Sequence, residues 1–251
     1  MSRVRVSLPA PIKENMKRLL TVLIFLLCVN VYAKPVEAYI LYNVDDSTIV
    51  ASKNPNDVAS VASLTKLMTA MVYLDSSKTV DRKLLDRLLI RSDNHAAMQI
   101  AKKYRGGYTA FIRAMNVKAV KMGLVNTKYK DPSGLSPNNR STVTEYVKIV
   151  VEADKYAIIR EISSTAEKRI QIVKRIKQKK KTYYKTLRNT NSLLLNEYDN
   201  IALSKTGFTN NAGRCLALVV EGTKKYVIVI FGEPTPTKRA DVARELISMI
   251  K

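Results

Sequence analysis

Histidine and cysteine are scarce in this sequence of 251 residues, which has one histidine, His95, and two cysteines, Cys28 and Cys215. One histidine cannot supply the several imidazole ligands of a typical catalytic zinc ion, so a multi-histidine zinc site is excluded. Histidine is also the usual base beside a catalytic serine, and here there is only one candidate for that role. Two cysteines allow at most one intrachain disulfide.

Acidic residues are few as well: 21 Asp and Glu against 43 Lys and Arg give a formal net charge of +22. Nine basic residues and no acidic one lie between Lys168 and Lys185. Two interpretations of this segment remain open. It is a solvated, mobile hairpin or loop, or it attracts the protein to an anionic polymer or membrane surface of the cell envelope.

The apolar run at residues 19–29 is too short to span a bilayer. It follows Met16-Lys17-Arg18 and precedes Val31-Tyr32-Ala33, which predicts a secretory signal peptide cleaved after Ala33. Translation either begins at Met16 or includes residues 1–15 as a long leading region. We therefore expect residues 1–33 to be removed and residues 34–251 to form one periplasmic domain. Export disfavours nucleic acid as a partner, and Cys215, alone in that domain, is expected to be a buried small hydrophobe.

The first of three informative motifs is Ser63-Leu64-Thr65-Lys66, in a stretch at 62–74 that is apolar nearly all round. That pattern predicts a buried helix with Ser63 in its first turn. Residues i and i+3 share a helix face, so the Lys66 ammonium is expected to lie against the Ser63 hydroxyl. Burial, with Lys205 as a second cation nearby, would disfavour the charged form of Lys66 and make it a base. The alternative is a Ser63 N-cap and a solvated Lys66.

The second motif is Ser92-Asp93-Asn94, between a charged amphipathic stretch at 81–91 and an apolar one at 96–104. This placement predicts a turn between two helices. There the Ser92 hydroxyl would pass a proton to a leaving amine, and Asn94 would hold the peptide group of a substrate. An ordinary helix cap is the alternative.

The third motif, Lys205-Thr206-Gly207, ends a strand-like run at 200–204. Two more strand candidates follow at 214–221 and 226–231, with turn signals between them. The pattern predicts an antiparallel meander with the motif at its rim.

At that rim Lys205 and Thr206 would grip a substrate carboxylate. Gly207 would let a ligand approach the backbone closely. Backbone N–H groups of Ser63 and Phe208 would form an oxyanion hole. Alternatively, Lys205 is a protective charge on an edge strand.

The ordered set of three motifs indicates a penicillin-binding serine peptidase. From about Glu37 onward, the chain resembles the low-molecular-mass penicillin-binding proteins of the D-alanyl-D-alanine carboxypeptidase family, and particularly their small periplasmic endopeptidases. One departure is Ser60, where the family usually has proline. Beyond the motifs, the resemblance rests on residues 62–70, 106–112, 134–135, 188–191 and 203–215.

The resemblance implies that Ser63 is acylated by D-Ala-D-Ala and that Lys66 is its base. Ser92 and Asn94 would relay a proton and bind the acyl side of the substrate. The substrate would be peptidoglycan peptides, and β-lactam antibiotics would be covalent inhibitors. Neither a metal nor another cofactor is implied.

For the terminal carboxylate of the substrate, the resemblance implies binding by Lys205 and by Thr209, two residues beyond the glycine of the third motif. Arg188 matches an arginine that resembles a carboxylate anchor.

The pattern of elements predicts an α+β fold. A hairpin of strands at 38–42 and 48–51 comes first, helices fill the middle, and the meander and a helix at 237–250 close the chain. The resemblance implies a β-lactamase/DD-peptidase-like fold: one antiparallel sheet flanked by helices, an inserted helical subdomain, and the site at their junction. Thr142-x-x-Glu145 predicts a capping box at the start of the helix that returns to the sheet.

Two alternative functions are weighed against this one. A class A β-lactamase resembles the site but carries a Glu-x-x-x-Asn string for deacylation, and no Glu here has Asn four residues on. The other alternative is a catalytically silent protein that binds the cell envelope through the basic segment. In that case the three motifs would have arisen by coincidence or would remain from an ancestral enzyme. Both the terminal D-Ala-D-Ala bond and the diaminopimelate crosslink follow a D-Ala carbonyl, so carboxypeptidase and endopeptidase activity both remain open.

Overall fold

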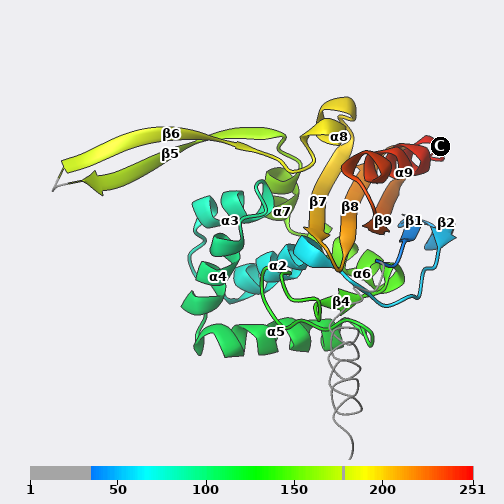
Figure 1. Ribbon diagram of the computed structural model, residues 1–251, viewed down its shortest axis with the longest axis horizontal. Helices are drawn as coiled ribbons and strands as arrows, with labels where there is room; N and C mark the ends of the chain where they lie inside the picture. The colour runs from blue at the N-terminus through cyan, green and yellow to red at the C-terminus, as the bar shows by residue number, and fades with distance from the viewer. Residues whose placement is uncertain (1–34, 177–178, 251) are drawn as a thin grey trace, which may run out of the picture. The chain divides into compact units, whose positions relative to one another are not determined.

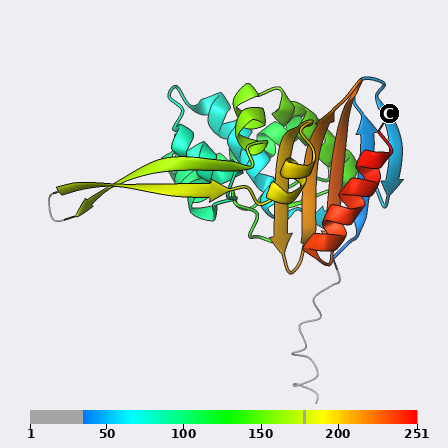
Figure 2. The ribbon, with the colours of Figure 1, turned by 90° about the horizontal axis from the view of Figure 1, so that it is seen from above.

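The computed structural model describes residues 35–176 and 179–250 (Figure 1). The expected signal peptide lies outside these residues and stays a prediction. The described part has the expected α+β fold, one antiparallel sheet with helices on both faces (Figure 2). None of its helices is both long and apolar enough to cross a membrane.

The central sheet has five strands in the order β2-β1-β9-β8-β7, and every neighbouring pair is antiparallel. The N-terminal hairpin and the C-terminal meander are both confirmed. The expected strand at 200–204 proves longer, because Lys205-Thr206-Gly207 continues to pair with β8 instead of following the strand. The bounds are β1 Ala38–Asn43, β2 Thr48–Lys53, β7 Ile201–Thr209, β8 Gly213–Glu221 and β9 Lys225–Glu233.

Strands β7, β8 and β9 are buried on both faces of the sheet, whereas β2 is mostly exposed. Their side chains alternate between the two faces. In β8, Cys215 and Ala217 belong to one core, whereas Leu216 and Leu218 belong to the other. The second core lies under α9, which crosses the sheet in Figure 2. The first core packs against α6 and the short helix η1. Helix α8 also contributes to the second core, through Leu194 and Leu195. The bounds of these helices are η1 Ala62–Thr65, α6 Val143–Asp154, α8 Ser192–Glu197 and α9 Pro236–Ser248.

The helical part of the protein is built around α2, which contacts α3, α4, α5 and α6. Its residues Leu67, Met68 and Met71 are fully buried. The buried helix expected at 62–74 is confirmed, with η1 as its first turn. The remaining bounds are β3 Ala59–Ser60, α2 Lys66–Ser76, α3 Arg82–Leu89, α4 Asn94–Lys103, α5 Gly107–Lys121, β4 Arg140–Ser141 and α7 Ala157–Ser163.

The start of α6 shows one half of the predicted capping box. The Glu145 N–H donates to Thr142 Oγ1 at 3.1 Å. The Glu145 carboxylate does not return to Thr142 but accepts hydrogen bonds from the Val125 and Asn126 amides and the Thr127 hydroxyl. The reciprocal bond was wrongly predicted because a loop distant in sequence offers this carboxylate several donors at once.

The basic segment forms a two-stranded hairpin, β5 (Glu167–Ile176) and β6 (Lys179–Arg188). It extends away from the central sheet, past α3 (Figures 1 and 2). At its base Leu187 is buried and Lys168 Nζ donates to the Asp86 carboxylate of α3 at 2.8 Å. The hairpin interpretation is confirmed, and attraction to an anionic surface stays a prediction.

Candidate active site

Ser63 lies in a tight turn for which two glycines leave room. The preceding residue, Ala62, has a φ of 44°, in the left-handed region. A Cβ on Gly134 would lie 1.8 Å from the Ala62 carbonyl oxygen, and a Cβ on Gly207 would lie 3.1 Å from the Ser63 nitrogen. The space beside Gly207 is therefore filled by the turn that carries Ser63, and not by a ligand as the sequence suggested. Glycine is needed at 134, where φ is also positive, and at 207 an added Cβ would press on the turn of Ser63.

Lys66 is fully buried at the start of α2. Its Nζ donates to Ser63 Oγ at 2.7 Å, to Asn94 Oδ1 at 2.8 Å and to the Ser133 carbonyl oxygen at 2.6 Å. A neutral amine keeps two N–H donors and gains a lone pair. Deprotonated Lys66 is therefore able to keep its bonds to Asn94 and Ser133 while it accepts the hydrogen of the Ser63 hydroxyl.

The protonation of Lys66 is set mainly by its environment in the core. Burial lowers the pKa of Lys66 from 10.5 to about 7, and the carboxylates of Asp131 and Asp93 oppose this shift. Near neutral pH, a substantial fraction of Lys66 is thus uncharged, which is the state that a general base requires.

Ser92-Asp93-Asn94 occupies the expected turn between α3 and α4, and the helix-cap interpretation is confirmed, whereas proton relay by Ser92 and substrate binding by Asn94 stay predictions. Asp93 is the N-cap of α4 and accepts hydrogen bonds from the amides of the next turn. Ser92, at a φ of 56°, is turned so that its Oγ accepts a hydrogen bond from Lys205 Nζ at 2.9 Å. Arg87 of α3 fixes the turn by donating its Nε to Asp93 Oδ2 at 2.8 Å. Burial acts to raise the pKa of Asp93, but the hydrogen bond from Arg87 helps to hold it below its ordinary value.

Lys205 is 1% exposed, which argues against a protective charge on an edge strand. Its Nζ donates to Ser92 Oγ and to the Thr206 carbonyl oxygen at 2.8 Å. Burial, followed by repulsion from Lys66, lowers the pKa of Lys205 well below its ordinary value. The sequence suggested that Lys205 lowers the pKa of Lys66. Burial, the other cause that the sequence suggested, is the main one at Lys66, and repulsion between the two lysines disfavours both being charged at once.

The segment before β7 supports the third motif through residues other than the predicted one. Thr206 Oγ1 donates to Thr190 Oγ1 at 2.6 Å, and Asn191 Nδ2 donates to Ser204 Oγ at 2.9 Å. Arg188 has a side chain that is 79% exposed and pairs with Glu167 at 3.2 Å. Among the described residues, no hydrogen bond or ion pair joins it to the motifs, so its role as a carboxylate anchor stays a prediction.

The end of β7 holds two further predicted residues at the rim of the sheet. Thr209 Oγ1 accepts a hydrogen bond from the Ala212 amide at 3.1 Å, which leaves its own hydrogen available. Phe208 is 46% exposed, and the Arg214 guanidinium lies 3.5 Å from the centre of its ring. Carboxylate binding by Thr209 and the oxyanion role of the Phe208 amide stay predictions.

The loop at 131–139 also lies at the site, because its Ser133 carbonyl accepts the hydrogen bond from Lys66. The sequence had indicated no role for this loop. The Asp131 carboxylate accepts hydrogen bonds from the amides of Ser133, Gly134 and Ser136. Although burial acts to raise it, these bonds hold the pKa of Asp131 below its ordinary value. Asn139 Nδ2 donates to Thr65 Oγ1 and so ties the loop to the first motif. The density of Asp, Pro, Ser, Gly and Asn in this loop indicated a turn, but nothing in the sequence showed that the turn faces Lys66.

Two further features of the described residues lie outside this arrangement. Cys215 is buried as expected, and burial raises the pKa of its thiol to about 12, far from that of a reactive thiolate. No group of three or more metal-ligating side chains occurs within residues 35–176 and 179–250.

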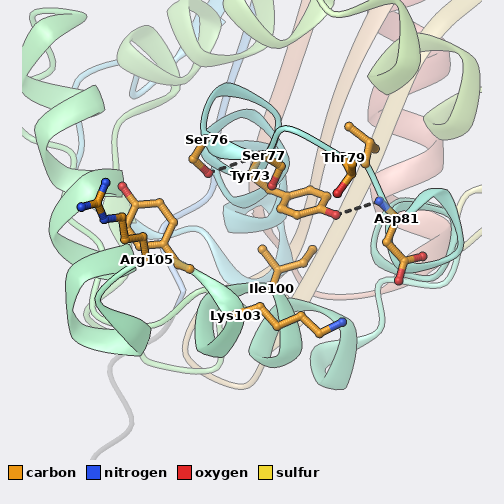
Figure 3. A pocket seen from close by; sticks show the side chains of 10 residues that line it. Tyr73, Ser76, Ser77, Thr79, Asp81, Ile100, Lys103 and Arg105 are labelled. Carbon is orange, nitrogen blue, oxygen red and sulfur yellow. Dashed lines mark hydrogen bonds between the residues drawn. The ribbon is translucent and has the colours of Figure 1, made fainter.

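A cavity of about 550 Å³ between the end of α2 and α4 contains none of the motif residues (Figure 3). In it the Tyr73 hydroxyl accepts a hydrogen bond from the Asp81 amide at 2.8 Å, and Ile100 and Lys103 of α4 lie opposite. This contact fixes the loop between α2 and α3.

Comparison with known proteins identifies the family that this chain matches. The peptidase S11 family, described as D-alanyl-D-alanine carboxypeptidase, matches residues 30–87 and 77–235. The D-alanyl-D-alanine endopeptidase of Pseudomonas aeruginosa is 37% identical over 198 residues, which are 68% of this chain and 62% of that protein. The D-alanyl-D-alanine endopeptidase of Escherichia coli K12 is 35% identical over 227 residues, 78% of this chain and 71% of that protein. The match therefore spans less than two thirds of the Pseudomonas relative.

The fold is similarly shared with a solved structure. The crystal structure of the Streptomyces K15 DD-transpeptidase superposes with a TM-score of 0.78 at 25% identity, and the match covers 86% of this chain and 98% of that one.

Proposed function

The chain belongs to the D-alanyl-D-alanine carboxypeptidase family, peptidase S11, and on that basis we propose that it is a serine peptidase that cleaves peptidoglycan peptides after a D-Ala carbonyl. The observation that carries the proposal is the buried Lys66 amine, 2.7 Å from Ser63 Oγ and with its pKa lowered to about 7. A serine and a base in this relation form an activated nucleophile without histidine.

In the first half of the reaction, neutral Lys66 takes the Ser63 proton while Oγ attacks the D-Ala carbonyl carbon. Negative charge that develops on the carbonyl oxygen is met by the N–H groups of Ser63 and Phe208. The amine leaves with a proton delivered through Ser92, and an ester between Ser63 and the acyl group remains. The proton that Lys66 took from Ser63 has by then gone to the leaving amine, so Lys66 is neutral again. Water attacks the ester, Lys66 takes a proton from this water and gives it to Ser63 Oγ as the ester C–O bond breaks, and the acid product leaves.

Binding of the substrate depends on the other side of the site. Asn94 holds the acyl side, and Lys205, Thr206 and Thr209 hold the carboxylate of the leaving group, with Arg188 as an outer anchor. An arriving carboxylate favours the ammonium form of Lys205, which opposes the lowering of the Lys205 pKa by burial. Substrate binding and the charge on Lys205 are therefore coupled.

Two curated relatives are named endopeptidases, which favours cleavage of crosslinks as the main activity. The protein would act in the periplasm after removal of residues 1–33, and would contribute to cell wall remodelling and cell shape. The basic hairpin would hold it near anionic envelope material. β-Lactams would acylate Ser63 and leave slowly, because the Glu-x-x-x-Asn string of class A β-lactamases is absent from the sequence.

The test is covalent labelling by a fluorescent penicillin followed by mass spectrometry of the labelled peptide. We expect the adduct on Ser63 and no label on the Ser63→Ala variant. Labelling at another serine, or undiminished labelling of Ser63→Ala, would contradict the proposal. Digestion of purified peptidoglycan and identification of the released muropeptides then distinguishes endopeptidase from carboxypeptidase activity.

A further inference from the structure

A groove of about 660 Å³ lies between α3 and the base of the β5–β6 hairpin. We call it the α3–β5 groove. Its lining combines an apolar part with basic side chains and a single acid. The residues are Ile170, Gln171, Ile172, Leu187, Lys83, Arg87, Arg91, Lys185 and Asp93.

The basic side chains of the α3–β5 groove outnumber its acids. Arg87 is paired with Asp93 at 2.6 Å. Lys83, Arg91 and Lys185 are exposed and form no ion pair with any side chain that the structure describes. Three uncompensated cations around one concave surface attract an anion, and their donors suit carboxylate oxygens.

The α3–β5 groove begins next to Ser92 of the second motif. Two of its lining residues, Arg91 and Asp93, flank Ser92 in the chain. In the proposed function Ser92 delivers the proton to the leaving amine, so the leaving nitrogen lies at Ser92. Whatever is attached to that nitrogen and is too large for the site itself has to extend past Ser92, and the two chain neighbours of Ser92 line the α3–β5 groove.

We propose that the α3–β5 groove binds the leaving strand of a crosslinked substrate, a peptide with free carboxylates. The inference rests on the proposed function and assigns a substrate class to it. A carboxypeptidase releases one D-alanine, which Lys205 and its neighbours hold alone. An endopeptidase releases a second stem peptide, whose carboxylates bind Arg91 and Lys185 and whose aliphatic linking side chain packs on Ile172.

The test compares wild type with an Arg91→Gln/Lys185→Gln double variant on three substrates: a crosslinked muropeptide dimer, a monomeric pentapeptide and a fluorescent penicillin. We expect kcat/KM for the dimer to fall about tenfold, mainly through KM, because charge-assisted hydrogen bonds to the leaving strand are lost. Penicillin acylation and pentapeptide cleavage stay within about twofold of wild type, because neither ligand reaches the groove. Amidation of only those dimer carboxylates that lie beyond the one held by Lys205 lowers the wild-type rate similarly and has little further effect on the double variant.

The matched control is Arg113→Gln/Lys121→Gln on α5, which removes the same charge from residues outside the groove and should leave all three rates unchanged. If the double variant cleaves the dimer as well as this control does, or loses penicillin acylation equally, the groove does not bind the leaving strand. Those results leave the proposed function intact. A wild-type protein that is not labelled by penicillin and cleaves neither peptide would instead overturn the proposed function.

Discussion

Buried and exposed basic side chains lie on either side of Ser92, which accepts a hydrogen bond from Lys205 and follows Arg91 in the chain. Lys66 and Lys205 are 0% and 1% exposed, each is bound to neutral oxygen atoms, and burial lowers the pKa of both. Lys83, Arg91 and Lys185 of the α3–β5 groove, in contrast, are exposed to solvent. Desolvation makes an amine a proton acceptor, whereas a solvated cation keeps its charge and acts by attraction. In the proposed function, basic side chains thus serve the chemistry when they are buried and bind substrate when they are exposed.

The largest expected effect comes from replacing the buried amine. Lys66→Arg should lower the rate of penicillin acylation by about two to four decades, because guanidinium does not deprotonate in proteins. Stopped-flow acylation measures the rate, and thermal unfolding shows whether the larger side chain is accommodated. Lys121→Arg, on an exposed face of α5, is the control and should be silent. A folded Lys66→Arg variant with normal acylation would mean that the base lies elsewhere.

A second prediction concerns the glycine that makes room for the Ser63 turn. Gly134 and Gly123 both have positive φ, at 86° and 69°, but only Gly134 faces the Ala62 carbonyl. Gly123→Ala should cost about 1 kcal/mol of stability through backbone strain and leave acylation unchanged. Gly134→Ala adds a steric clash and should lower acylation about a hundredfold or prevent folding. Equal behaviour of the two variants in thermal unfolding and acylation would show that the turn tolerates displacement.

The smallest effect is expected from the cations of the basic segment at 168–185. Changing Lys177, Lys179, Lys180 and Lys181 to Gln should weaken cosedimentation with purified sacculi about tenfold at low salt, with acylation unaffected. The difference should vanish at 1 M salt, where the Debye length falls to about 3 Å. Equal pelleting of variant and wild type at low salt would reduce the segment to a solvated hairpin.

The sequence predicted the contact between Ser63 and Lys66 and a helix cap in the second motif because the interacting residues are close together in the chain. Ser63 and Lys66 meet because three residues separate them on a helix, and Asp93 caps α4 as its residue type indicates. The meander and the closing helix followed equally from short-range alternation and periodicity. These elements depend on interactions within a few residues, and a sequence displays such interactions directly.

What the sequence did not predict depends on contacts between distant segments. The Ser133 carbonyl reaches Lys66 across 67 positions of the chain, and the Glu145 carboxylate leaves its own helix cap for a loop about 20 residues earlier. Gly207 was expected to admit a ligand, but the turn of Ser63 fills that space. The α3–β5 groove likewise arises only when a hairpin and a helix far apart in sequence pack together.

If Lys66 is a neutral general base, its protonation controls the rate of penicillin acylation, and the pH dependence of that rate shows it. The rate constant is measured for wild type from about pH 5 to about pH 9, with unfolding monitored in parallel. Because the pKa of Lys66 is about 7 and only its neutral form accepts the Ser63 proton, the rate should rise about tenfold per pH unit below 7 and level off above it. A flat profile, or a rate that still rises at pH 9 toward the ordinary lysine pKa of 10.5, would show that Lys66 with a lowered pKa is not the base.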